Sequence, residues 1–501
     1  MTARPEFASD TLDGLFGEVA AGHPDVVAYV EGEHRITYRE WTARADALAA
    51  ELTARGVGER DVVAIMLPSS IDFAVAYATA SRLGAIATGV NPRLGSTEIT
   101  AILERCRPAV LFHEGPGDPV PEGAPRPPVV MARDELRALA ARDVERAMVP
   151  VPAPDDPACI VWTSGTTGTP KGAWFDHRAL RASAEMSGIL SSPFDVRSMP
   201  LPFAHAGYMN KMWDQLAHVI TSVLLPGVWT PESMLDVMVR ERVTVGQGVP
   251  TQWSKMLELP GLADADLSSL RLASTGSAPV SPELAERMRT RLGCPIVVRY
   301  ACTESSTMTG TAPDDPAEVL LNTVGRPLPG VEMALVDEDL AEVGEGATGI
   351  IRMRTPCQMR GYWDDDERTA EAMSPDGWIF TGDLGRFRPD GNLVLCGRRT
   401  EMYIRGGYNV YPLEVEHALS EHPAVDRVAV LGADAPTIGE IGVAFVVPAD
   451  PGAPPTRDEL RAWCRGRLAD YKAPDRVEVV DELPLTSMMK VDKAALRARL
   501  D

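Results

Sequence analysis

The sequence lacks the features that membrane, secreted and disulfide-stabilised proteins need. Among its 501 residues no apolar run approaches the roughly 18 residues of a membrane-spanning helix. The first ten residues contain neither the basic nor the apolar part of a secretory signal. The seven cysteines are scattered, odd in number and never in a C-x-x-C pair, which argues against disulfides and zinc. We therefore expect a cytoplasmic protein without a membrane span.

Basic charge is also scarce. The chain has 49 lysines and arginines against 71 aspartates and glutamates, a formal net charge of -22. Such a surface repels nucleic-acid phosphates and anionic lipid, so no nucleic-acid partner is expected. Any anionic ligand must be held by local positive groups. The six lysines are therefore worth following individually: Lys171, Lys211, Lys255, Lys472, Lys490 and Lys493.

The length and the pattern of apolar runs predict two domains of mixed α/β structure. Residues 62–67 and 85–90 are predicted to form buried strands, and residues 72–83 a helix between them. This order is that of a βαβ unit. Thr37 and Glu40 form a capping box before another helix. After residue 400, helices at 412–422 and 456–468 alternate with short strands at 427–431, 442–447 and 477–480. We predict an α/β fold with a large N-terminal domain (1–400), in which β-like pieces follow the βαβ-type sheets, and a small α+β C-terminal domain (401–501).

One segment stands out chemically. It follows the apolar run 158–162 and combines three glycines, five hydroxyl side chains and one lysine, which suits an anion cradle. The alternative is an ordinary Ser/Thr/Gly surface loop. It is not a Walker loop, because Pro170 precedes the lysine and a β-like run follows it. The segment consists of Thr163, Ser164, Gly165, Thr166, Thr167, Gly168, Thr169, Pro170, Lys171 and Gly172.

This segment resembles the phosphate loop of the acyl-adenylate-forming superfamily, which includes acyl-CoA synthetases, aryl-CoA ligases, luciferases and peptide-synthetase adenylation domains. The following motifs come in the family's order. Residues 299–304 resemble its Tyr-Gly-x-Thr-Glu motif. The resemblance implies that Tyr300 packs on adenine, Thr303 meets the phosphate and Glu304 holds Mg²⁺. Alone, so short a motif would carry no weight.

Two further motifs would complete the nucleotide site. Asp383, in Thr-Gly-Asp, and Arg398, in Gly-Arg, resemble the family's pair on the ribose hydroxyls. Taken alone, Asp383 could equally be a turn residue. The resemblance also places three residues at the ligand pocket: Ser277, Ala278 and Pro279.

The C-terminal part carries the motifs of a mobile small domain. Gly406 and Gly407 resemble the loop that lines the pantetheine tunnel after this domain rotates, with Glu401 as the hinge residue by position. Lys490 resembles the lysine that neutralises the reacting carboxylate and the α-phosphate. On its own it would be an ordinary solvated lysine. The resemblance runs from about residue 15 to 497.

Several positions depart from the family pattern. Ala301 and Met489 replace the usual glycines, and Ile350 replaces a usual glutamate. Ala204 separates the usual Phe-His pair, so His205 is either the catalytic gate or a structural histidine. Because amino-acid-activating relatives have an Asp where Ala204 stands, an α-amino acid is disfavoured. By resemblance, Ala301 adds a methyl group to the wall of the acid pocket. This favours a short, medium-length or flat acid over a long straight chain.

The resemblance implies ATP-dependent activation of a carboxylic acid as acyl-AMP, with pyrophosphate release and transfer to the thiol of CoA. ATP, Mg²⁺ and CoA are the implied cofactors and co-substrates. Another acceptor, a carrier protein or an amine, remains open, as does a diazotase that activates nitrite for an aryl amine. A non-enzymatic nucleotide-binding module is disfavoured because all five charged motif residues are present: Lys171, Glu304, Asp383, Arg398 and Lys490.

Overall fold

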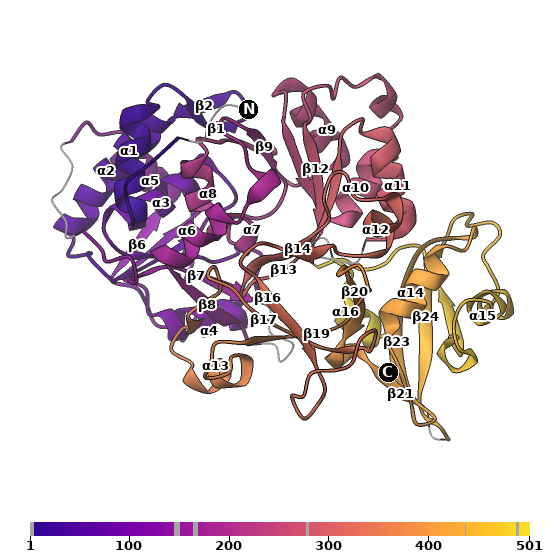
Figure 1. The fold of residues 1–501 in the computed structure, drawn as a ribbon. Coiled ribbons are helices and arrows are strands. Elements are labelled where there is room, and N and C mark those ends of the chain that lie inside the picture. Colours follow the sequence, from indigo (N-terminus) through magenta and orange to yellow (C-terminus); the bar gives the residue numbers. More distant parts are fainter. Residues whose placement is uncertain are drawn as a thin grey trace.

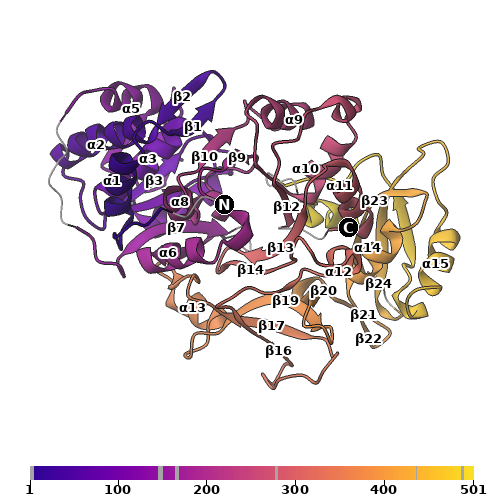
Figure 2. The same cartoon turned by 45° about the horizontal axis from the view of Figure 1, so that its top comes forward.

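The computed structural model describes residues 5–144, 151–163, 169–276, 280–435, 437–486 and 490–500. The prediction of a large α/β N-terminal part followed by a small α+β C-terminal part is confirmed. The C-terminal part, orange to yellow in Figures 1 and 2, lies beside the strands that end the large part. No helix in the described ranges combines the length and apolarity needed to cross a bilayer.

The first sheet carries the chain's βαβ units. Its inner strands run parallel, and β3 and β5 are buried throughout because helices cover both faces. Alternate residues of β3 pack against α2 and α3 on one face and against α4 on the other. The spatial order is β18 (Gly361–Tyr362), β8 (Lys171–Asp176), β7 (Pro157–Thr163), β4 (Ile86–Gly89), β3 (Val62–Met66), β5 (Val110–His113) and β6 (Val129–Ala132).

Helices of the first half pack around this sheet and lead into the second. The capping box predicted at Thr37 and Glu40 is confirmed at the start of α2. These helices are α1 (Leu12–Gly22), α2 (Tyr38–Ala54), α3 (Ile71–Arg82), α4 (Ser96–Cys106), α5 (Arg133–Ala140), α6 (His177–Glu185), α7 (Ala206–Met209) and α8 (Met212–Ala217).

The second sheet crosses the middle of the large part. Its order is β15 (Arg326–Pro327), β14 (Ser306–Gly310), β13 (Ile296–Cys302), β12 (Leu272–Gly276), β11 (Val245–Gly248), β9 (Val196–Met199), β10 (Thr221–Leu224), β1 (Val27–Glu31) and β2 (His34–Thr37). The antiparallel pair β13 and β14 places the motif residues 300–304 at one edge of the sheet. Its helices are α9 (Pro231–Arg240), α10 (Pro250–Leu257), α11 (Pro282–Arg291) and α12 (Ala317–Asn322).

A third, antiparallel sheet connects the large part to the C-terminal domain. Its order is β16 (Glu332–Val336), β17 (Gly349–Arg354), β19 (Ile379–Phe387) and β20 (Leu393–Arg398), and α13 (Asp366–Ala372) precedes β19. Figure 1 shows β20 next to α14 and α16 of the C-terminal domain. The third sheet thus lies next to the C-terminal helices, and the predicted boundary at residues 400/401 falls just after β20.

The C-terminal domain has its own sheet and core. The order is β22 (Tyr408–Val410), β21 (Tyr403–Arg405), β24 (Gly439–Pro448) and β23 (Val425–Ala435), with β25 (Arg476–Val479) also paired to β24. Its helices are α14 (Pro412–Ser420), α15 (Arg457–Arg465) and α16 (Lys493–Arg497). The Lys493 ammonium lies 2.7 Å from a carboxylate oxygen of Glu401 and 3.0 Å from one of Glu416. This ion-pair cluster joins α16 and α14 to the segment just after β20.

Candidate active site

The structure brings together three motif residues that are far apart in the sequence. The hydroxyl of Tyr300, on β13, donates to Asp383 Oδ2 at 2.6 Å across 83 residues of sequence. Arg398 Nε donates to the other carboxylate oxygen at 2.9 Å, because Asp383 and Arg398 pair directly across β19 and β20. Gly382, inside β19, has φ +74°, a left-handed conformation that glycine adopts most easily.

This arrangement fixes the Asp383 carboxylate before any ligand arrives. Asp383 is 8% exposed, and its burial raises its pKa while the charge of Arg398 opposes that rise. Each carboxylate oxygen accepts one hydrogen bond from the protein and has lone pairs left for a ligand. The pair is therefore suited to hold neighbouring hydroxyl groups, such as those of a ribose.

A second group of residues lies where the first sheet meets the motif 299–304. Thr163 and Lys171 pair at the ends of β7 and β8. The Lys171 ammonium lies 5.3 Å from the centre of the Tyr362 ring, and the Tyr362 hydroxyl donates to Glu304 Oε1 at 2.8 Å. Tyr362 thus connects the lysine of one motif with the glutamate of another, while Thr303 lies beside Glu304 in the turn between β13 and β14.

No sequence pattern points to Tyr362 as a site residue. It belongs to β18, a two-residue strand that pairs with β8. The Trp363 N–H donates to the Gly172 carbonyl at 2.7 Å, and Arg360 pairs with Asp176 at 2.7 Å, so both flanks of β18 are fixed to β8. Only this tertiary pairing reveals that Tyr362 faces Glu304.

Some predicted residues lie outside the described ranges. From the phosphate loop these are Ser164, Gly165, Thr166, Thr167 and Gly168, and from the pocket segment Ser277, Ala278 and Pro279. The residues on either side of both segments are described. For these eight positions the predicted roles stay predictions.

Lys490 lies at the nucleotide site although it belongs to the C-terminal domain. Burial lowers its pKa, the charge of Arg398 lowers it further, and the charge of Asp383 opposes this. The charge of Lys490 in turn lowers the pKa of His205, which burial has already depressed, to about 4. The ammonium of Lys490 therefore lies within electrostatic range of Arg398, Asp383 and His205.

His205 serves the fold as well as the site. It is the residue before α7, and its Nδ1 accepts the Gly207 N–H at 3.2 Å as a helix cap. With a pKa of about 4 its imidazole is neutral at physiological pH. Of the two sequence interpretations, catalytic gate and structural histidine, the geometry supports a structural role and leaves a gating role as a prediction.

The docked Lys490 predicts an alkaline loss of adenylation activity. Its lowered pKa means that the ammonium loses its proton below the ordinary lysine value of 10.5. If adenylation uses the charged form, pyrophosphate release falls as pH rises through that lowered pKa. Arginine keeps its charge over this range, so Lys490→Arg should lose the alkaline fall. The measurement is a pH profile of kcat for both proteins, and the same fall in both would contradict the assignment.

Glycines 406 and 407 form a tight turn on the exposed side of the small domain. They connect β21 and β22 with φ values of +57° and +87°, the geometry of a two-residue hairpin turn. Nothing lies within 4 Å of a Cβ built on either residue. In this domain orientation the turn is open. Such openness is expected of a surface that becomes enclosed only after the small domain rotates.

Among the described residues of the site, Glu304 is a candidate metal ligand. No cluster of three or more His, Cys, Asp or Glu side chains suited to a metal occurs among the residues described. Mg²⁺ commonly uses one or two carboxylates together with substrate phosphates and water. Glu304 fits that pattern, because Tyr362 donates to Oε1 and the carboxylate has further lone pairs for an ion.

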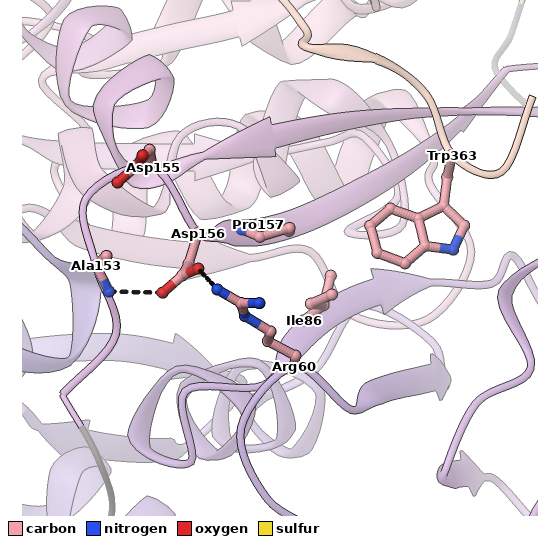
Figure 3. Close-up of a pocket in the computed structure, with 7 residues that line it drawn as sticks. All are labelled: Arg60, Ile86, Ala153, Asp155, Asp156, Pro157 and Trp363. Atoms are coloured by element: carbon pink, nitrogen blue, oxygen red, sulfur yellow. Dashed lines mark hydrogen bonds and ion pairs between the residues drawn. The ribbon is translucent and has the colours of Figure 1, made fainter. Parts of the chain in front are cut away.

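A depression elsewhere on the large domain does not belong to this site (Figure 3). It is lined by Arg60, Ile86, Ala153, Asp155, Asp156, Pro157 and Trp363. Its main polar groups satisfy one another, since Asp156 accepts from Arg60 at 2.5 Å and from the Ala153 N–H at 2.7 Å. None of the predicted site residues lines it.

These groups, an aspartate held by Tyr300 and Arg398, Lys171 at the end of a strand pair, Glu304 in a turn and Lys490 from the small domain, match the set expected of an adenylate-forming enzyme. The chain belongs to the AMP-binding enzyme family, whose model matches residues 16–363. The model of the AMP-binding enzyme C-terminal domain matches residues 414–490.

Known relatives extend over almost the whole chain. A methyl-dioxo-octahydro-indenyl-propanoyl:CoA ligase of Mycobacterium tuberculosis is 36% identical, with 95% of this chain and 96% of the relative covered. ATP-bound MatB from Rhodopseudomonas palustris has a TM-score of 0.87 at 29% identity, covering 98% of this chain and 99% of that one. The amide bond synthetase McbA from Marinactinospora thermotolerans has a TM-score of 0.85 at 30% identity, covering 98% and 100%.

Proposed function

We propose that this protein is an acid:CoA ligase that activates a carboxylic acid as acyl-AMP and transfers the acyl group to the thiol of CoA. The observation that carries adenylation is the docking of Lys490 beside the Asp383 and Arg398 pair. The CoA acceptor is supported by the open glycine turn at 406–407 and by the name of the mycobacterial relative.

In the first half-reaction the acid's carboxylate oxygen attacks the α-phosphorus of ATP and pyrophosphate leaves. Asp383 and Arg398 hold the ribose, and Tyr300 supports Asp383 from β13 while its ring is available to adenine. Lys171 and Thr163 hold the outer phosphates. Lys490 stabilises the charge that gathers between carboxylate and α-phosphate, so catalysis is mainly positioning and electrostatics.

Glu304 would hold Mg²⁺ against the ATP phosphates. The ion supplies charge neutralisation on the phosphates when it is bound. Tyr362 fixes the Glu304 carboxylate by its hydrogen bond to Oε1 and keeps it next to Lys171. The lysine and the carboxylate are thereby held close to one tyrosine before ATP binds.

In the second half-reaction the small domain rotates at residues 398–401, withdraws Lys490 and brings Gly406 and Gly407 to the acyl-adenylate. A thiol sulfur then attacks the acyl carbon and AMP leaves. No nucleophilic side chain of the protein is needed. Cys302, in the motif itself, is unsuited to that role because burial raises the pKa of its thiol well above 9.

The test is acid-dependent pyrophosphate release over a panel of aliphatic acids, aromatic acids and nitrite, with and without CoA. The expected result is release with one or more acids and an acyl-CoA product by mass spectrometry only when CoA is present. Adenylate without a CoA product, but with amide formed from an added amine, would replace CoA by an amine acceptor. Release with nitrite and none with acids would overturn the proposal.

A further inference from the structure

Lys211 is a lysine deep in the large domain whose charge the adenylation chemistry does not use. It lies in the short connection between α7 and α8, and its ammonium donates to Ser183 Oγ at 3.1 Å. No carboxylate oxygen of the described residues lies within 4.0 Å of it. By contrast, Lys472 and Lys493 both form ion pairs with glutamates.

The surroundings of Lys211 connect it to the active-site wall. Ser183 Oγ lies 3.1 Å from Ser306 Oγ, and Ser306 begins β14 two residues after Glu304. Ser306 has φ +64°, a left-handed conformation that is uncommon for a residue with a Cβ. The Cys357 thiol, whose pKa the charge of Lys211 affects, donates to the Ser305 carbonyl at 3.2 Å. Lys211 therefore lies behind the turn that carries Thr303 and Glu304.

Lys211 lies close to His205 in the chain and away from the charges of the nucleotide site. From His205 the chain reaches Lys211 in six mostly helical residues, roughly 9 Å at 1.5 Å per residue. The charged groups that act on Lys211 include Asp214, Arg197 and Arg299, and none of the nucleotide-site charges is among them. Part of its surface is left uncovered by the domain, as is part of His205.

The charge of Lys211 is not balanced by its neighbours. Asp214 is already engaged through Oδ2, which accepts from Arg197 at 3.0 Å and from Ser191 at 2.8 Å, while His218 Nδ1 lies 3.1 Å from Oδ1. Burial lowers the pKa of Lys211, and the field of Asp214 only partly opposes this. An ammonium placed this deeply without a carboxylate partner is costly to the fold. An anionic group on a ligand would offset that cost.

We propose that Lys211, with Ser183 and Ser306, selects acids that carry a second anionic group at the end remote from the reacting carboxylate. An ammonium and two hydroxyls can together donate to both oxygens of a carboxylate. The inference rests on the proposed function, because it names the substrate class of the same site. It concerns specificity alone, since Lys490 and Lys171 supply the charges for the chemistry.

The test uses matched acids that differ only in the remote group. Adipate is compared with hexanoate and terephthalate with 4-methylbenzoate, by kcat/KM for pyrophosphate release at saturating ATP. We expect the wild type to prefer the diacid of at least one pair by more than about 10-fold. Lys211→Met should lower kcat/KM for that diacid by roughly 10- to 100-fold, mostly through KM, because a charged hydrogen bond is lost. The monoacid should change by less than about twofold.

Lys255→Met is the matched control, because Lys255 lies in the last turn of α10, outside the nucleotide motifs. If Lys211→Met does not fold, as judged by circular dichroism and thermal melting, Ser183→Ala removes one hydroxyl of the same group and should lower the diacid preference. The wild-type comparison within each pair is independent of both variants.

The outcomes distinguish a failure of the proposed role of Lys211 from a failure of the proposed ligase function. A wild type that prefers the monoacid in both pairs, or a Lys211→Met variant that loses all acids equally, overturns the role of Lys211 and leaves the ligase proposal intact. A wild type that releases no pyrophosphate with any acid overturns the ligase proposal and this inference with it.

Discussion

Lys490→Ala is expected to slow pyrophosphate release by roughly 10²- to 10³-fold, which corresponds to about 2.7 to 4 kcal/mol of lost transition-state stabilisation. The reason is the docked position of the lysine, whose charge reaches both the ribose pair and His205. Supplied with a preformed acyl-adenylate, the same variant should transfer the acyl group at close to the normal rate, because rotation withdraws this residue from the second half-reaction.

The control for Lys490→Ala is Lys255→Ala, which removes an ammonium from the large domain far from the nucleotide motifs in sequence. It should leave both half-reactions unchanged. An equal loss in the two half-reactions of Lys490→Ala, or no loss in either, would show that Lys490 does not act in adenylation alone.

Gly407→Leu should have the opposite pattern, with thiol transfer reduced by about 10²-fold and adenylate formation nearly intact. In the docked orientation nothing lies within 4 Å of a Cβ at this position, so the leucine has no partner to disturb during adenylation. After rotation the same side chain would stand where the thiol arm must pass, and a displacement of about 1 Å at a reacting group costs this much. Separate assays of pyrophosphate release and of acyl-CoA formation measure the two effects.

Gly391→Leu is the matched control for the backbone strain that Gly407→Leu introduces. Gly391 also lies in an exposed turn, with φ +79° and nothing within 4 Å of a built Cβ, but in the large domain. Both leucines meet the same left-handed penalty. If Gly391→Leu lowers thiol transfer as much as Gly407→Leu does, the loss reflects strain and the glycine turn does not line the thiol path.

The sequence was most informative where chemistry and local structure coincide. Thr37 and Glu40 predict a helix start because a capping box is a local arrangement, and the structure contains it. The strands around 62–66 and 86–89 were predictable for a similar reason, since buried parallel strands read as short apolar runs. The family resemblance supplied the order of the motifs, from which the meeting of Tyr300, Asp383 and Arg398 could be expected.

Residues outside the motifs could not be found in this way. Tyr362 reaches Glu304 because a two-residue strand pairs with β8, and such a strand has no sequence pattern of its own. Lys211 was visible as one of few lysines, but its burial without a carboxylate depends on the packing of α6 against α8 and on Asp214 being taken by Arg197. Both features arise from tertiary contacts between distant segments.

The ion-pair cluster of Lys493 limits which backbone torsions can change when the small domain rotates. Its ammonium connects Glu401, directly after the end of β20, to Glu416 on α14, so Glu401 is fastened to the small domain. A rotation that keeps both ion pairs must take up its torsional change on the N-terminal side of Glu401, in the peptide units of Arg399 and Thr400. Under the proposed rotation at residues 398–401, α16 would therefore hold Glu401 with the small domain and leave the torsional change to the residues before it.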